Sequence, residues 1–143
     1  MAAHYESKHG IVSRSREEMY MAFTDLRAFS AMLPEEKKQM VQADADTISA
    51  TVQGFTIGVK VTLRQPYSMI ELQDNGAPFK FAVWLHFDEN GVPGKTDFHI
   101  AVEADLNLMM KMMLGSKIQE ALDKIVDSLV DASEGRVPKD FKF

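Results

Sequence analysis

The chain has 143 residues, which fits one domain that can bury a real core. Its net charge of −5 argues against a nucleic-acid partner and disfavours an anionic membrane surface. It contains no cysteine, which excludes disulfides, thiol nucleophiles and thiolate metal sites. No signal peptide is visible, and no apolar run approaches the ~20 residues of a spanning helix. We therefore expect a cytoplasmic protein with one domain over residues 1–143.

The first expected element is a strand from Tyr5 to Val12. The charged residues Glu6 and Lys8 alternate there with other side chains, and such a period of two is typical of a half-buried strand. The set that we expect to face inward is Tyr5, Ser7, His9 and Ile11.

Two short helices are expected next. Ser15 and Glu18 have the spacing of a capping box, in which each side chain bonds the other residue's backbone amide. Thr24 and Asp25 are suited to end this helix and to cap a second one, which ends at Pro34. The apolar residues of the second helix are Phe29, Met32 and Leu33, and the polar run 35–38 is expected to be a solvated connector.

From residue 40 to residue 105 the sequence alternates strands with turns. Turn residues gather at 44–46, 53–54, 65–68, 74–77 and 89–94, which divides this part into six strands. Asn75-Gly76 is the strongest hairpin signal, because a type I′ turn needs positive φ at both central residues. A two-residue turn there would place Leu72 opposite Phe79 and Glu71 opposite Lys80.

Charge predicts the register of the last hairpin. Pairing Leu85 with Phe98 places Asp88 opposite Lys95, whereas a slip by two residues places Asp88 opposite Asp97. Opposite charges are favoured over like charges by ~0.2–1 kcal/mol per pair, so we expect the first register. The other face of the sheet carries charges, threonines, Trp84 and His99. The apolar face then comprises Phe55, Ile57, Val59, Val61, Leu63, Ile70, Leu72, Phe79, Phe81, Val83, Leu85, Phe87, Thr96, Phe98, Ile100 and Val102.

The last element is a helix from about Leu106 to Ser133. From Ile118 it is amphipathic, with Leu122, Ile125 and Leu129 on the apolar stripe. Gly115 costs ~1 kcal/mol relative to alanine in a helix, so we expect a bend, a break or a loosened turn there. Residues 135–143 are expected to form a loosely ordered tail.

The order of elements leaves a large apolar sheet face that only the last helix is big enough to cover. Three segments resemble the START/Bet v 1-like (SRPBCC, helix-grip) superfamily, near its bacterial polyketide cyclase/dehydratase-like members. "VSRSREEMYMAFTDL" is similar to the opening segment, with Tyr20 in the place of an aromatic residue. "TDLRAFSAMLP" resembles the second short helix, and "GFTIGVKVTLRQPYSMIEL" resembles the middle strands. The resemblance covers essentially the whole chain.

The resemblance implies an α+β helix-grip fold. A curved antiparallel sheet of seven strands would grip the C-terminal helix, with two short helices after the first strand and a cavity between sheet and helix. Members of the superfamily commonly bind lipids, sterols, polyketides or other hydrophobic molecules, and some are enzymes. They share no functional residue set, so no catalytic residue is transferred, and no cofactor is expected.

The segment "LNLMMKMMLGSK", residues 106–117, places apolar side chains on several sides of the helix start. Methionine is flexible and fills irregular space, which suits a cavity that repacks around different ligands. An ordinary packed core, a cavity lining and a docking interface all remain open, and we expect Lys111 to face water.

Few residues suggest catalysis. The four histidines lack metal-ligand spacing, so no metal site is expected. His9 and Tyr5 are the weak catalytic candidates, although a buried histidine is usually a hydrogen-bonded core residue. Asp25 and Asp44 are interpreted as capping and turn residues. The residues expected to bind a ligand are Tyr5, His9, Phe29, Met32, Phe55, Ile57, Val59, Phe81, Val83, Leu85, Phe98, Ile100, Met109, Met110 and Met113.

Three functions follow as hypotheses. The first is binding or transport of a small hydrophobic molecule between the sheet and the last helix. The second is a polyketide cyclase/dehydratase-like enzyme that uses the same cavity. The third is a protein-interaction module in which the Met-rich segment docks a partner helix or a second subunit, with a homodimer as one form. An enclosed pocket containing His9 supports the first two, and an exposed Met patch supports the third.

Overall fold

The computed structural model describes residues 2–31, 35–52, 55–76 and 79–135. The predicted positions Met32, Leu33 and Pro34 and most of the predicted tail lie outside these ranges. The elements in chain order are β1 (Ala2–Glu6), β2 (Gly10–Val12), α1 (Arg16–Thr24), α2 (Leu26–Ala31), α3 (Glu35–Lys38), β3 (Val41–Ala43), β4 (Thr47–Val52), β5 (Phe55–Gln65), β6 (Met69–Asp74), β7 (Phe81–Glu89), β8 (Thr96–Asp105) and α4 (Leu108–Ser133).

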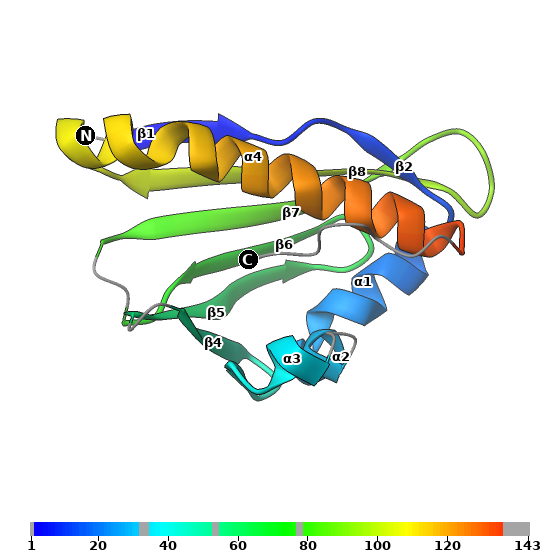
Figure 1. Cartoon of the computed structure of the whole chain (residues 1–143). Helices are drawn as coiled ribbons and strands as arrows, with labels where there is room; N and C mark the ends of the chain where they lie inside the picture. The colour runs from blue at the N-terminus through cyan, green and yellow to red at the C-terminus, as the bar shows by residue number, and fades with distance from the viewer. Residues whose placement is uncertain (1, 32–34, 53–54, 77–78, 136–143) are drawn as a thin grey trace.

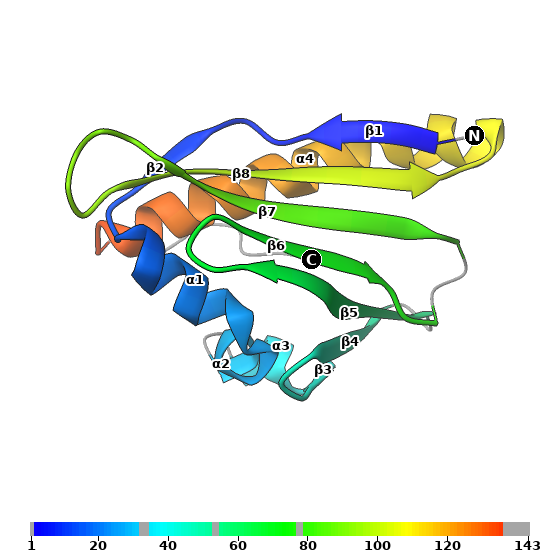
Figure 2. The ribbon, with the colours of Figure 1, turned by 180° about the vertical axis from the view of Figure 1, so that it is seen from behind.

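The strands form one antiparallel sheet, and α4 runs along one of its faces (Figure 1). The strand order is β1-β8-β7-β6-β5-β4-β3, and β2 pairs with β8 in continuation of β1. Figure 2 shows the opposite face of the sheet, which no helix covers, and α1 to α3 lie together at one end. The predicted α+β helix-grip fold is confirmed, with eight strands because the first is divided in two. No helix among the described residues is long and apolar enough to cross a membrane.

The core lies on the face of the sheet that carries α4, here called the inner face. Phe87 and Phe98 are fully buried, and the ring of Phe23 from α1 lies 6.1 and 6.2 Å from their rings. Val83 and Leu85 pack against the same cluster, together with Leu122 and Ile118 of α4. The predicted division of β7 and β8 into an apolar inner face and a polar outer face is therefore confirmed.

Local capping explains the two helix starts. The Ser15 Oγ accepts a hydrogen bond from the Glu18 amide at 3.1 Å, and the Ser15 amide donates to the Glu18 carboxylate at 3.3 Å, so the predicted capping box is confirmed. The Asp25 carboxylate accepts from the Arg27 amide at 2.9 Å at the start of α2. The predicted connector 35–38 forms a short helix, α3, with Lys38 paired to Glu35.

Helix α4 begins at an Asn107 cap and continues without interruption to Ser133. Of the bend, break or loosened turn predicted at Gly115, the break is wrong. A β-carbon at Gly115 would lie 3.1 Å from the Tyr5 hydroxyl, so the glycine leaves room for a side chain of β1. Its cost of ~1 kcal/mol in helix propensity is small beside the apolar surface that α4 buries along the sheet.

The predicted register of the last hairpin is also wrong. Leu85 pairs with Ile100, and Asp88 lies directly opposite Asp97. Each carboxylate has a histidine neighbour: His9 Nδ1 lies 2.9 Å from Asp97, and His99 Nδ1 lies 3.6 Å from Asp88. Both carboxylates are thus in contact with residues other than the one directly opposite, and a slip of two residues leaves the inner and outer faces unchanged.

The β6–β7 connection is longer than the two-residue turn that Asn75-Gly76 predicts. Leu72 pairs with Val83, not Phe79. The Asp74 carboxylate accepts from the Phe81 amide at 3.1 Å, and the Asn75 amide donates to the Gly58 carbonyl at 2.8 Å. The chain after β6 thus stays paired with β5 as far as Asn75 before it turns toward β7.

A bulge in β5 changes which residues face the core. Val61 pairs with Leu72, but Leu63 pairs with Glu71, so one extra residue lies between the two pairs. Leu63, predicted to face inward, is on the outer face and exposed, and Arg64 takes the inner position opposite Ile70.

Candidate functional site

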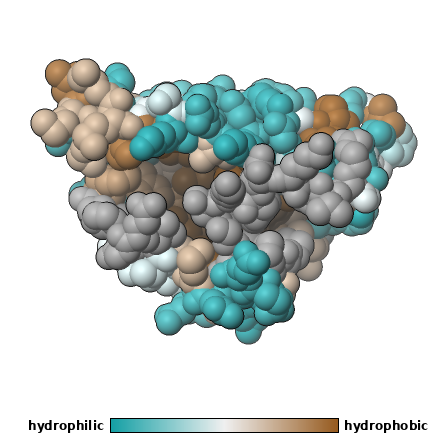
Figure 3. Space-filling model, viewed as in Figure 1, coloured by the Kyte–Doolittle hydropathy of each residue, from teal (hydrophilic) through white to brown (hydrophobic). Residues whose placement is uncertain are grey.

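The candidate site is the inner face of the middle strands beside α4. Helix α4 contacts β1, β2 and β8 and does not lie over β5 (Figure 1). Val59, Val61, Val83 and Leu85 are consequently only partly buried, although all four are apolar and pack against the core. Figure 3 shows hydrophobic surface within a hollow below α4. This arrangement leaves apolar contact area of the middle strands partly accessible beside α4.

Several predicted ligand-binding residues lie on this inner face or on the helices beside it. Tyr5, Phe29, Val59, Phe81, Val83, Leu85 and Met110 are partly buried against the core cluster, and Ile57 is on the same face of β5 and exposed. Phe98 and Ile100 are buried in the core, so they are not exposed to the space beside α4. Met32 and the side chain of Phe55 lie outside what the structure describes. Sequence reasoning missed Val61 and Ile118 as lining residues, although both lay on its apolar stripes.

Tyr5 places a polar group beside Gly115 of α4 on this face. Its hydroxyl is buried, and it has no hydrogen-bond partner among the residues that the structure describes. The ring lies against Gly115 of α4. Buried hydroxyls are nearly always hydrogen-bonded, so this group can donate to a polar atom of a guest or to a water molecule.

The prediction that His9 faces inward is wrong, and the cause is a bulge in the first strand. Glu6 pairs with Ala101 and Gly10 with Phe98, so three residues of the first strand oppose two of β8. The Ser7 hydroxyl fills the gap, accepting from the Ile100 amide at 2.8 Å. One extra residue reverses the alternation, so it moves His9 to the outer face, away from α4.

On the outer face, His9 belongs to a stack of three imidazole rings. The His9 and His99 ring centres are 4.2 Å apart, and those of His99 and His86 are 4.5 Å apart, with interplanar angles of 19° and 8°. Burial, followed by the proximity of His86 and His9, lowers the pKa of His99 below its usual value. Parallel rings do not converge on a point, and no three His, Asp or Glu side chains of the described residues form a metal site.

Most of the Met-rich segment projects into solvent. Leu108, Met109, Met112 and Met113 are 64–77% exposed, and we call these four residues the Met surface. Figure 3 shows a hydrophobic projection at the α4 end that carries them. Met110 alone among these methionines packs against the core cluster, and Lys111 faces water as predicted. The expectation that Met109 and Met113 line the space below α4 is therefore wrong.

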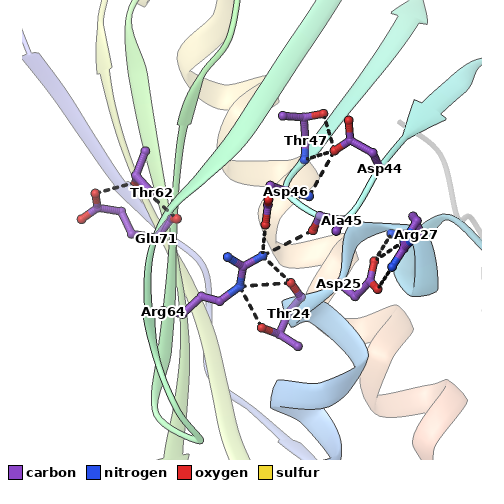
Figure 4. A network of polar contacts seen from close by, with 10 residues as sticks. All are labelled: Thr24, Asp25, Arg27, Asp44, Ala45, Asp46, Thr47, Thr62, Arg64 and Glu71. Carbon is purple, nitrogen blue, oxygen red and sulfur yellow. Dashed lines mark hydrogen bonds and ion pairs between the residues drawn. The ribbon is translucent and has the colours of Figure 1, made fainter.

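Arg64 joins three parts of the chain at the end of the sheet that carries α1. Its guanidinium donates to the Thr24 carbonyl at 2.7 Å, to the Asp46 carboxylate at 2.7 Å and to the Ala45 carbonyl at 3.3 Å (Figure 4). Asp44 closes the adjacent turn by accepting from the Thr47 amide at 2.9 Å, as its interpretation as a turn residue predicts. The network positions α1 and α2, and sequence reasoning missed it because only the bulge turns Arg64 inward.

Comparison with known proteins shows the fold. No protein-family model matches the chain, and no curated protein matches its sequence. Norcoclaurine synthase from Thalictrum flavum is 10% identical with a TM-score of 0.67, and the match covers 92% of this chain and 86% of that one. A START superfamily protein from Mycobacterium smegmatis is 14% identical, with a TM-score of 0.62 and coverage of 94% and 97%. The Aha1 dimer from Colwellia psychrerythraea is 17% identical, with a TM-score of 0.59 and coverage of 92% and 96%.

Proposed function

Because the chain has the START/Bet v 1-like helix-grip fold, we propose that it binds or transports a small hydrophobic molecule between α4 and the inner face of the sheet. One observation carries the proposal: the apolar side chains of the middle strands are incompletely covered. Water against such a surface is unfavourable by about 25 cal/mol per Å² of apolar area. Burial of this surface by an apolar guest therefore contributes favourably to the binding free energy. The side chains that the guest would cover are Val59, Val61, Val83 and Leu85.

A pair of tryptophan substitutions in β5 tests the site. Val59→Trp fills the proposed space from the inner face, whereas Lys60→Trp adds the same side chain to the exposed outer face. The probe is 1-anilinonaphthalene-8-sulfonate, followed by its fluorescence. We expect the wild type and Lys60→Trp to bind alike and Val59→Trp to lose about tenfold in affinity, ~1.4 kcal/mol.

Two results would contradict the proposal. One is absence of probe binding by the folded wild type. The other is equal affinity of the two tryptophan variants, which would place the probe elsewhere. Circular dichroism of each variant checks that the fold is retained.

The enzyme alternative is weakened by the position of His9. That residue lies on the outer face, so only Tyr5 of the two candidates remains near the space below α4. Its hydroxyl can orient a substrate, but none of the described residues is hydrogen-bonded to it to act as an acid or base partner. The likeness to norcoclaurine synthase, an enzyme by name, keeps a polyketide cyclase/dehydratase-like activity as the second hypothesis.

The interaction alternative gains support from the Met surface. Its members are spaced at i and i+4 in two pairs, so they form a continuous apolar strip on α4. A second copy of the chain is the partner that we favour, and the Aha1 structure of similar fold is a dimer. A net charge of −5 argues against nucleic acid. A cytoplasmic location remains a prediction.

Sedimentation velocity of Met112→Glu tests this alternative. The matched control is Met21→Glu, which changes an exposed methionine of α1. A dimer in the wild type that Met112→Glu alone dissociates supports self-association. A monomeric wild type at every concentration contradicts it.

A further inference from the structure

The histidine stack on the outer face is physically linked to α4 on the inner face. The link is the bulge at Ser7, Lys8 and His9, between β1 and β2. The His9 side chain extends from the bulge to the outer face, whereas Lys8 of the same bulge contacts α4. A change in the stack can therefore act on the helix that borders the proposed ligand site.

His99 occupies the centre of the stack, where burial opposes its protonation. Its side chain is 14% exposed. The buried Nδ1 has no hydrogen-bond partner among the described residues, since the Asp88 carboxylate is 3.6 Å away. Burial and the two neighbouring rings oppose protonation, and Asp88 and Glu6 favour it more weakly. Asp97, also on β8, is held by His9 at 2.9 Å.

Three contacts tie the bulge and the end of β1 to one face of α4. The Lys8 amide donates to the Asp123 carboxylate at 2.7 Å, and the Lys8 ammonium pairs with Asp127. The Gln119 amide donates to the Glu6 carbonyl at 2.6 Å.

Gly10 follows the bulge directly. A β-carbon at Gly10 would lie 2.6 Å from a Val126 methyl, so backbone and helix are in close contact there. These contacts hold α4 against the edge strands.

We propose that the His9–His99–His86 stack is a pH-sensitive latch: when its rings become protonated, they separate, the bulge moves, and α4 loosens from the sheet edge. Two protonated rings about 4 Å apart repel each other, and a proton on His99 is poorly solvated. Release of a hydrophobic guest at acidic pH follows, and that consequence rests on the proposed function, whereas the loosening itself does not.

The direction of the effect follows from His99. Its pKa in the folded chain lies below the ordinary value of 6.5. The folded state therefore binds fewer protons than the unfolded state over the range between the two values. The contribution of His99 to stability is fully present above the unfolded pKa and is lost as the pH falls through the lowered folded pKa.

Hydrogen exchange of the full chain at pH 7.5 and pH 5.5 tests the latch, with rates normalised to the unfolded chain at each pH. Amides 119–130 of α4 should lose at least tenfold in protection at pH 5.5. His99→Phe keeps an aromatic ring in the stack but cannot be protonated, so it should keep its protection at both values. His4→Phe removes an exposed histidine of the same face and should behave as the wild type.

His86→Gln is the second variant, in case His99→Phe does not fold. It removes one like charge, so the loss of protection should move to lower pH. Unchanged protection in the wild type at pH 5.5 would overturn the proposal, as would an equal loss in His99→Phe. Binding of 1-anilinonaphthalene-8-sulfonate at pH 7.5 is measured separately: if it fails while α4 still loosens in acid, the proposed function is wrong and the latch stands.

Discussion

Gly10 gives the sharpest test of how α4 sits on the sheet. Its β-carbon position is 2.6 Å from Val126 Cγ1 and 2.8 Å from Val130 Cγ2. Both valines are β-branched residues of a helix, where one χ1 rotamer dominates, so neither methyl can turn away cheaply. Gly10→Ala must therefore displace α4 or strain its side chains.

Overpacking of this kind costs ~1–3 kcal/mol. Replacing a glycine by alanine at a compatible backbone conformation stabilises the protein by ~0.4–1 kcal/mol, because it lowers the conformational entropy of the unfolded chain. The net expectation for Gly10→Ala is a loss of about 1–2 kcal/mol in the free energy of unfolding, measured from urea denaturation at constant m-value.

Gly115→Ala is the matched control. The nearest atom to its β-carbon position is the Tyr5 hydroxyl at 3.1 Å, at the far end of a side chain that can shift. A helix-interior alanine gains up to ~1 kcal/mol over glycine, so this variant should be neutral or more stable. Val126→Ala removes one of the two close contacts, so Gly10→Ala should cost less in the Val126→Ala background than in the wild type. A Gly10→Ala protein as stable as the wild type would refute the close approach of α4 to β2.

Three further outcomes are expected. Ser15→Ala removes the α1 cap and should cost ~1 kcal/mol in unfolding free energy by urea denaturation; no change would mean that the cap is dispensable. Arg64→Met leaves the partly buried Thr24 carbonyl without its donor and should cost ~1–3 kcal/mol in the same assay, whereas a more stable variant would contradict the role of the network. Amides 108–114 should exchange with solvent faster than amides 122–129, because the Met surface is exposed whereas Leu122 and Val126 are buried against the sheet; equal strong protection of the two segments would contradict this difference.

The sequence predicted the fold class because its signals are periodic and redundant. The capping box at Ser15 and the stripe of α4 each rest on several residues that agree. The division of β7 and β8 into faces survived a wrong register, since a slip by two residues preserves which side chains face inward.

The positions of individual site residues were harder to predict because they depend on single-residue insertions. A bulge beside Ser7 turns His9 outward, and a bulge between Val61 and Leu63 turns Arg64 inward. In strands this short, neither bulge can be recognised from the alternation of polar and apolar residues in the sequence. The charge argument for the last hairpin failed for a related reason: it compared only directly opposed residues, whereas Asp97 is paired with His9 on another strand.

The most direct test of the account is to locate a bound hydrophobic probe on the folded chain. Backbone amide NMR spectra are recorded during titration with 1-anilinonaphthalene-8-sulfonate at pH 7.5. Binding between α4 and the inner face predicts saturable shifts of the Val59, Val83 and Leu85 amides and of the facing residues of α4. The Lys60 amide should change little. Shifts confined to the Met surface, or none at all, would contradict binding between α4 and the inner face of the sheet.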